Sequence, residues 1–99
     1  MQTDTNMATE AEMLALKLER ELMHAYGSPL LTGEKLAEAM GYRSIHSLRK
    51  HVSQRNFPIE LFSIQGRRGR FALVRDIALW LAKQRLEHQH KPEDRIIGE

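Results

Sequence analysis

Residues 31–52 read LTGEKLAEAMGYRSIHSLRKHV, and their apolar spacing predicts two short helices joined by a tight turn. Two apolar triplets recur at intervals of three or four residues: Leu36, Ala37 and Met40, then Ile45, Leu48 and Val52. Thr32 and Ser44 precede the two triplets and are good N-cap residues. Gly41 lies between them and suits a left-handed residue that ends the first helix. The segment therefore indicates a helix-turn-helix.

The outward side of the second helix carries hydrogen-bond donors and no acid. With its apolar triplet facing inward, this side shows seven residues: Arg43, Ser44, His46, Ser47, Arg49, Lys50 and Gln54. Arginine and lysine pair with guanine or phosphate, and serine and histidine suit bases or phosphate. The pattern predicts a recognition helix for DNA, in which Arg49 and Lys50 are the strongest base-reading candidates.

A basic loop follows the two helices. Residues 61–65 are expected to form a short strand, residues 66–70 a hairpin loop and residues 71–73 the returning strand. The loop places Arg67, Arg68 and Arg70 between glycines that let the backbone approach another molecule closely. Because arginine binds phosphates and narrow minor grooves well, we expect this hairpin to grip a DNA backbone.

These motifs together resemble a known superfamily over residues 30–86. The resemblance rests on six motifs: residues 31–37, Gly41-Tyr42, Ser47-Leu48-Arg49, Pro58, the 66–71 loop, and Asp76-Ile77 with Trp80-Leu81. They are similar to the excisionase/MerR-type winged helix-turn-helix superfamily, which includes small DNA-binding regulators of phages and mobile elements. The resemblance implies that the last helix packs behind the wing. The segment from Gly41 to Leu48 is about one residue longer than the common pattern.

A long helix is expected before this unit. Apolar residues follow one face from Ala11 to Tyr26, and Gly27-Ser28-Pro29 ends the run. Leu14, Leu18 and Leu22 on this face are the candidate residues for a homodimer contact. A second apolar edge makes the stripe wider than one small core requires: Met13, Leu16 and Met23. The helix either packs across the back of the domain or also meets a partner helix.

The predicted fold class is mainly α, with a two-stranded β-hairpin wing and an extra N-terminal helix. We expect a flexible start over residues 1–9, the long helix over 10–29, a winged helix-turn-helix over 30–86 and a loose polar tail over 87–99. A final helix is expected from Asp76 onward, with Ile77, Ala78, Trp80, Leu81 and Leu86 supplying its apolar contacts. The length of 99 residues suits one domain.

Charge is distributed unevenly along the chain. The formal net charge is +2, but residues 1–31 hold two basic and five acidic residues, and residues 87–99 hold two and four. Residues 32–86 hold eleven basic and four acidic residues, which gives +7. Such a segment attracts polyanions through counterion release. With no cysteine, no membrane-spanning run and no signal-like start, we expect a cytoplasmic protein.

The residues offer little for catalysis. Glu34 and Glu38 share a helix face, and an exposed pair at this spacing is usually a solvated surface. His46 and His51 have no serine and aspartate arranged with them as a catalytic triad. His88 and His90 could touch a metal but have no fixed third ligand. We therefore expect no enzyme, cofactor or metal site.

Three functions remain open. The first is a dimeric transcriptional regulator of double-stranded DNA, with RNA polymerase as a further partner. The second is a recombination directionality factor, which bends DNA so that an integrase excises a mobile element. The third is a protein-interaction module that binds an acidic surface. A steep salt dependence of duplex binding would distinguish the first two from the third.

Overall fold

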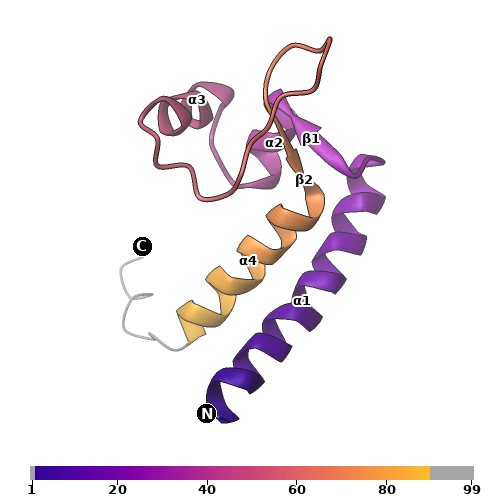
Figure 1. Cartoon of the computed structure of the whole chain (residues 1–99), viewed down its shortest axis with the longest axis vertical. Coiled ribbons are helices and arrows are strands. Elements are labelled where there is room, and N and C mark those ends of the chain that lie inside the picture. The colour runs from indigo at the N-terminus through magenta and orange to yellow at the C-terminus, as the bar shows by residue number, and fades with distance from the viewer. Residues whose placement is uncertain (1, 90–99) are drawn as a thin grey trace.

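The computed structural model describes residues 2–89, with side chains described for residues 9–88. Six elements follow one another along this part of the chain (Figure 1): α1 (Gln2–Tyr26), β1 (Leu30–Thr32), α2 (Gly33–Ala39), α3 (Ile45–Ser53), β2 (Phe71–Leu73) and α4 (Val74–Gln89). The predicted helix-rich class with a small antiparallel β pair is confirmed at this level. None of the helices in residues 2–89 combines the length and apolar character that a membrane span needs.

Helices α1 and α4 lie side by side and run in opposite directions (Figure 1). Helix α1 begins at Gln2, within residues 1–9, for which a flexible start was predicted. No glycine or proline interrupts the chain before Gly27, so nothing in the local sequence stops the helix. At the other end α4 continues to Gln89, past the predicted start of the tail, and residues 90–99 lie outside the described part.

The core is built where α2, α3 and the two strands meet the start of α4. Its buried cluster consists of eight residues: Leu31, Leu36, Ala37, Met40, Leu48, Ala72, Val74 and Ile77. Ile77, Ala78 and Ala82 of α4 have no exposed surface. Leu22 and Tyr26 near the end of α1 pack against the cluster, so the long helix and the helix pair share one core. Helix α3 is anchored in this core through Leu48.

The small sheet pairs segments that are far apart in the sequence. Strands β1 and β2 are antiparallel, with Leu31 opposite Ala72 and Thr32 opposite Phe71. Residues 61–65 do not form the predicted first strand; within them only Phe62 bridges to β2. Phe62 and Phe71 exchange both backbone hydrogen bonds, at 2.9 and 2.8 Å. The prediction had the returning strand right and its main partner wrong, because residues 61–65, and not residues 30–32, were expected to pair with it.

The turn between α2 and α3 is the predicted one. Gly41 has a φ of +85°, the left-handed conformation that glycine adopts without strain. Its N–H donates to the Glu38 carbonyl at 3.1 Å, and the Tyr42 N–H donates to the Ala37 carbonyl at 2.9 Å. These two bonds form a Schellman motif, which satisfies the last carbonyls of α2 and turns the chain toward α3.

Candidate nucleic-acid interface

Helix α3 turns its apolar side to the core and its polar side to solvent. Leu48 is 7% exposed, and Ile45 and Val52 are half-buried, as the spacing predicts. This burial decides which side of the helix faces solvent. The exposed residues of the helix and its C-cap are His46, Arg49, Lys50, His51, Ser53 and Gln54. Ser47 is half-buried at the edge of this surface.

Both ends of α3 are held by side chains. The Ser44 hydroxyl accepts a hydrogen bond from the Ser47 N–H at 3.2 Å, which confirms Ser44 as the N-cap. Tyr42 stacks on Phe57 with ring centroids 6.0 Å apart, and its hydroxyl lies 3.1 Å from Nδ1 of His51. Burial raises the pKa of Tyr42. The exposed side of α3 is therefore presented by a helix that side-chain contacts hold at both ends.

The arginine loop (residues 63–70) joins Phe62 to β2. It starts with a turn in which the Arg67 N–H donates to the Ile64 carbonyl at 2.9 Å. Gly66 at the third position of this turn has a φ of +81°, as a type II turn requires. Arg67 and Arg68 follow and are exposed. The loop holds two guanidinium groups in solvent, where no carboxylate of the loop itself can neutralise them.

Thr32 fastens the loop to the helix pair. Its side chain was predicted to cap α2, but it makes no capping hydrogen bond. The hydroxyl instead donates to the Arg70 carbonyl at 2.6 Å. A Cβ atom placed on Gly69 would lie 3.5 Å from the same Thr32 oxygen, and Gly69 has a φ of +86°. The returning arm of the arginine loop therefore passes close to the start of α2.

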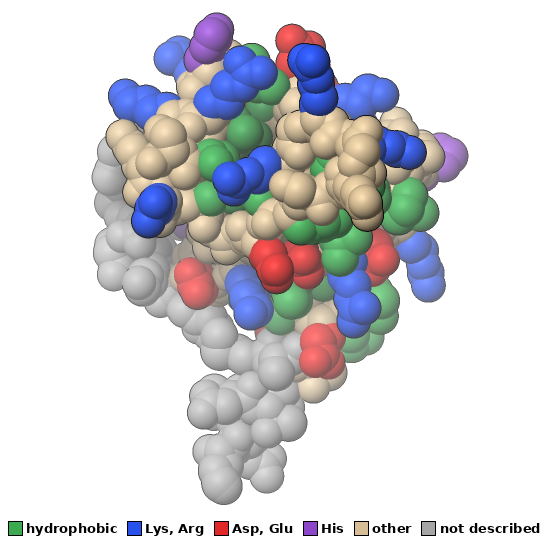
Figure 2. Space-filling view, turned by 45° about the horizontal axis from the view of Figure 1, so that its top comes forward, with side chains coloured by type: hydrophobic (Ala, Val, Ile, Leu, Met, Phe, Trp, Pro, Cys, Tyr) green, Lys and Arg blue, Asp and Glu red, His purple; other side chains and the backbone are tan. Residues whose placement is uncertain are grey.

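Basic side chains collect at the end of the molecule that carries α3 and the arginine loop. Figure 2 views that end obliquely, and Lys and Arg side chains are spread over it. Most of the Asp and Glu side chains visible in this view lie farther down the molecule. The charge asymmetry of the sequence is thus also an asymmetry in space, and one end of the molecule presents a positive field.

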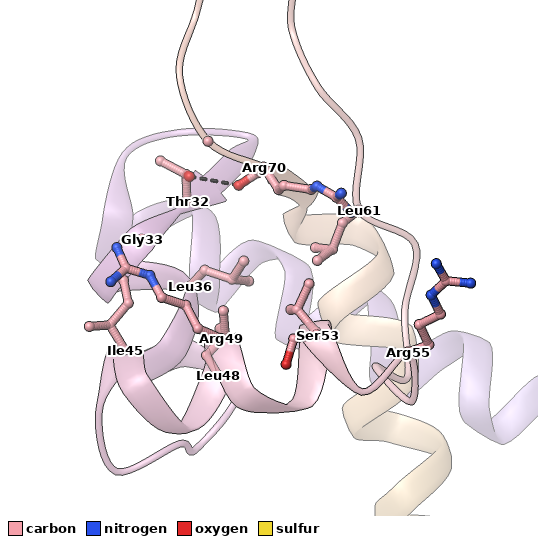
Figure 3. Close-up of a pocket in the computed structure, with 12 residues that line it drawn as sticks. Thr32, Gly33, Leu36, Ile45, Leu48, Arg49, Ser53, Arg55, Leu61 and Arg70 are labelled. Atoms are coloured by element: carbon pink, nitrogen blue, oxygen red, sulfur yellow. Dashed lines mark hydrogen bonds between the residues drawn. The ribbon is translucent and has the colours of Figure 1, made fainter.

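An open groove separates α3 from the arginine loop (Figure 3). Its floor is apolar and comes from α2, α3 and the segment before the loop: Leu36, Ile45, Leu48, Val52 and Leu61. Three arginines border it: Arg49 from α3, Arg55 from the segment after α3, and Arg70 from the arginine loop. We call these three residues the groove arginines. Side chains from three segments are therefore brought to the edges of one depression.

Arg55 is the member of this set that the sequence analysis did not single out. Its φ is +60°, and it is the one residue other than glycine with a positive φ in the described part of the chain. The Arg55 N–H donates to the Val52 carbonyl and the Asn56 N–H to the His51 carbonyl, so α3 also ends in a Schellman motif. Glycine is the favoured residue at this position, as Gly41 is after α2. The sequence has no glycine between Val52 and Phe57, so a residue other than glycine had to take the left-handed position that ends α3. That was the signal available for Arg55.

Some predicted contact residues lie away from the groove. Arg43 and His46 border a second hollow, where α2 contributes Glu34 and Glu38. Glu38 accepts a hydrogen bond from the Tyr26 hydroxyl at 3.1 Å, which ties α1 to α2. Burial, followed by this bond to Glu38, raises the pKa of Tyr26. The acids of α2 therefore lie on the Arg43 side of the helix pair, away from the groove arginines.

The remaining predicted sites have separate outcomes. Leu14, Leu18 and Leu22, the candidate dimer residues, are half-buried in α1, and Leu22 packs on the core of its own chain. Within the described residues, no group of three or more potential metal ligands occurs. Of the two candidate histidines, His88 is exposed, and His90 lies outside the described part.

Comparison of the chain with protein-family models, with curated proteins and with solved structures finds no match.

Proposed function

We propose that this protein is a sequence-specific double-stranded DNA-binding protein of the winged helix-turn-helix type, acting as a dimeric transcriptional regulator. The observation that carries the proposal is the meeting of the groove arginines around the depression between α3 and the arginine loop. Three permanent positive charges from separate segments suit the phosphates of one nucleic-acid strand. The exposed side of α3, with donors and no acid, lies beside them.

In this proposal α3 enters the major groove, whose width of about 12 Å admits a helix. His46, Ser47, Lys50 and Gln54 then face base edges. A phosphodiester backbone follows the depression beside α3, where the groove arginines bind its phosphates. Arg67 and Arg68 extend past that backbone as a wing and reach the next phosphates or the minor groove.

The resemblance to excisionase/MerR-type proteins favours the same reading, with the wing formed by the arginine loop and α4 packed behind it. It leaves a recombination directionality factor as the second role within DNA binding. A palindromic site bound by one dimer, with RNA polymerase as the further partner, supports the regulator. Cooperative arrays on direct repeats with strong bending, in the presence of an integrase, would support the directionality factor instead.

Duplexes selected from a random pool, followed by a salt titration on the selected site, test the proposal. If at least four phosphates are bound, the log–log slope of affinity against salt should be about −3.6 or steeper. Unrelated duplexes should bind more weakly by a factor on the order of a thousand. A shallow slope, with heparin bound as tightly as any duplex, would instead identify a module that binds acidic protein surfaces.

Arg55 offers a test in which stability and binding move in opposite directions. Because an L residue in the left-handed conformation is strained, Arg55→Gly should raise the free energy of unfolding by about 1 kcal/mol. The same change removes one groove arginine and should weaken duplex binding about fivefold at physiological salt. Urea denaturation and a duplex titration on the same preparation measure both effects.

Arg55→Lys is the matched control, because it keeps the charge and the backbone strain. It should leave the unfolding free energy unchanged and retain most of the affinity. An Arg55→Gly variant that is more stable yet binds DNA as the wild type does would remove Arg55 from the interface.

A further inference from the structure

Helix α1 exposes an apolar stripe on the side that does not pack on the rest of the chain. Met13 is 66% exposed, Leu16 59% and Met23 38%. These residues are separated by three and seven positions, so they lie along one side of the helix. Three of the four large hydrophobic residues that are exposed in the described part of the chain belong to this stripe. Such a concentration is typical of a contact surface.

A hollow beside the stripe widens the apolar surface. It lies between α1 and α4, and Leu16 forms one edge of it. Ala15 and Leu79 contribute to its lining, and Arg75 and Lys83 of α4 lie at the hollow together with Glu12 and Glu19 of α1. A side chain from a second helix lying along the stripe would therefore find a recess to enter, as the knob of a coiled coil does.

The stripe matches two heptads of a coiled coil. In the heptad letters a to g, the assignments are a for Met13 and Arg20, d for Leu16 and Met23, e for Lys17 and His24, and g for Glu12 and Glu19. The acids thus flank one edge of the stripe and the bases flank the other. In a parallel pair, each g residue faces the e residue five positions later in the partner helix. Glu12 would face Lys17 of a second copy, and Glu19 would face His24.

We propose that two copies of this chain form a parallel homodimer through the Met13–Leu16–Met23 side of α1. The occupant is a second copy because Glu12 on one edge would face Lys17 on the other edge of the partner helix at the offset that parallel helices require. This surface lies outside the half-buried Leu14, Leu18 and Leu22 face, which the fold of one chain already uses in part. Dimerisation and packing on α4 can therefore occur together.

The parallel orientation also fits the proposed function, on which this part of the inference rests. The arginine loop stands at the end of the molecule where α1 finishes (Figure 1). Helix α1 runs along one side of the molecule. A two-fold axis along α1 would leave both arginine loops at the same end of the dimer. An antiparallel pair would place them at opposite ends of the assembly, where a single straight duplex could not meet both.

Substitution of Arg20 gives a test in which dimerisation should become tighter. A misfolded variant would not produce a tighter dimer. In the dimer two Arg20 side chains meet at an a position, where a charge lowers stability. Arg20→Leu should tighten dimerisation at least tenfold, as measured by sedimentation equilibrium on the full chain. Glu21→Leu adds the same side chain at an exposed position off the stripe and should leave the constant unchanged. Leu16→Lys should weaken dimerisation by a similar factor. A wild-type chain and an Arg20→Leu variant that both stay monomeric would overturn the proposal.

Single cysteines report the orientation, because the chain has none of its own. Oxidised Met13→Cys and Met23→Cys should each form disulfide-linked dimers, since equal positions meet in a parallel pair. Glu21→Cys should not. Equal crosslinking at residue 21 would overturn the assigned face. Crosslinking only in a mixture of the Met13→Cys and Met23→Cys chains would show an antiparallel pair and overturn the parallel arrangement.

Failure of the dimer and failure of DNA binding are separable. Arg49→Ala should lower duplex affinity while sedimenting as the wild type does. Leu16→Lys should bind a half-site duplex with unchanged affinity and lose the cooperative binding of a full site. If Leu16→Lys also keeps the cooperative binding of a full site, the stripe is not the dimer contact, although the DNA interface would stand.

Discussion

Replacing Arg67, Arg68 and Arg70 together by alanine should weaken binding to every duplex about a hundredfold at physiological salt. Each arginine that binds a phosphate releases counterions, so losing three contacts should make the log–log salt slope shallower by about 2.7. Arg67 and Arg68 are exposed at the tip of the arginine loop, and Arg70 borders the groove beside α3. Because phosphates are the same in every sequence, the ranking of DNA sites should not change.

A matched control removes the same charge elsewhere. Arg75, Lys83 and Arg85 are exposed on α4, outside the groove beside α3. The triple alanine variant at these positions has the same net charge as the loop variant. Both variants are titrated on a half-site duplex, because Arg75 and Lys83 lie at the hollow beside the proposed dimer stripe. The affinity of the control should fall only through the general field, by a factor far smaller than that of the loop variant. Equal losses in the two variants would mean that net charge, and not the position of the loop, governs binding.

Lys50→Ala should cost about 1–3 kcal/mol on the preferred site and relax the preference at one base pair. Lys50 is exposed on α3 roughly opposite the buried Leu48. In the proposed complex it therefore points into the major groove, toward the base edges. Arg49 lies a quarter-turn nearer the groove and borders it with Arg70. The structure therefore separates two residues that the sequence analysis had treated alike as base readers.

The two variants should consequently fail in different ways. Arg49→Ala should weaken all duplexes similarly and flatten the salt slope by about one. Lys50→Ala should leave binding to unrelated DNA nearly unchanged while specific binding falls. Titrations against the selected site, single-base variants of it and unrelated DNA measure the difference. Unchanged site preference in the Lys50→Ala protein would show that Lys50 does not read a base.

Periodicity was enough to locate the helices, although not the start of α1 or the end of α4. The spacing of Ile45, Leu48 and Val52 correctly indicated which side of α3 is buried, because the same apolar residues that favour a helix also anchor it. Gly41 marked the turn, since few other residues adopt its backbone conformation without strain. Ser44 was recognisable as an N-cap, because its capping bond reaches only to Ser47. These features are local, and one segment contains all the information they need.

The pairing of the strands was harder to predict from the sequence. Each strand has three residues, too few for an alternating pattern, and the pairing of Thr32 with Phe71 closes a long loop. The Thr32 hydroxyl could cap α2 or hold the Arg70 carbonyl, and only the folded chain decides between these bonds. The choice depends on where α4 places β2, which no local pattern specifies.

The chain's residues alone therefore specified the helices, the turn and the supply of positive charge, because short-range sterics and hydrophobic spacing govern all three. The shared core of α2, α3, the strands and α4 decided that Arg49, Arg55 and Arg70 share one groove, and the packing of α1 on α4 decided that Met13 and Leu16 stay in solvent. Such proximity depends on contacts between distant segments, whose relative positions exist only once the core has formed.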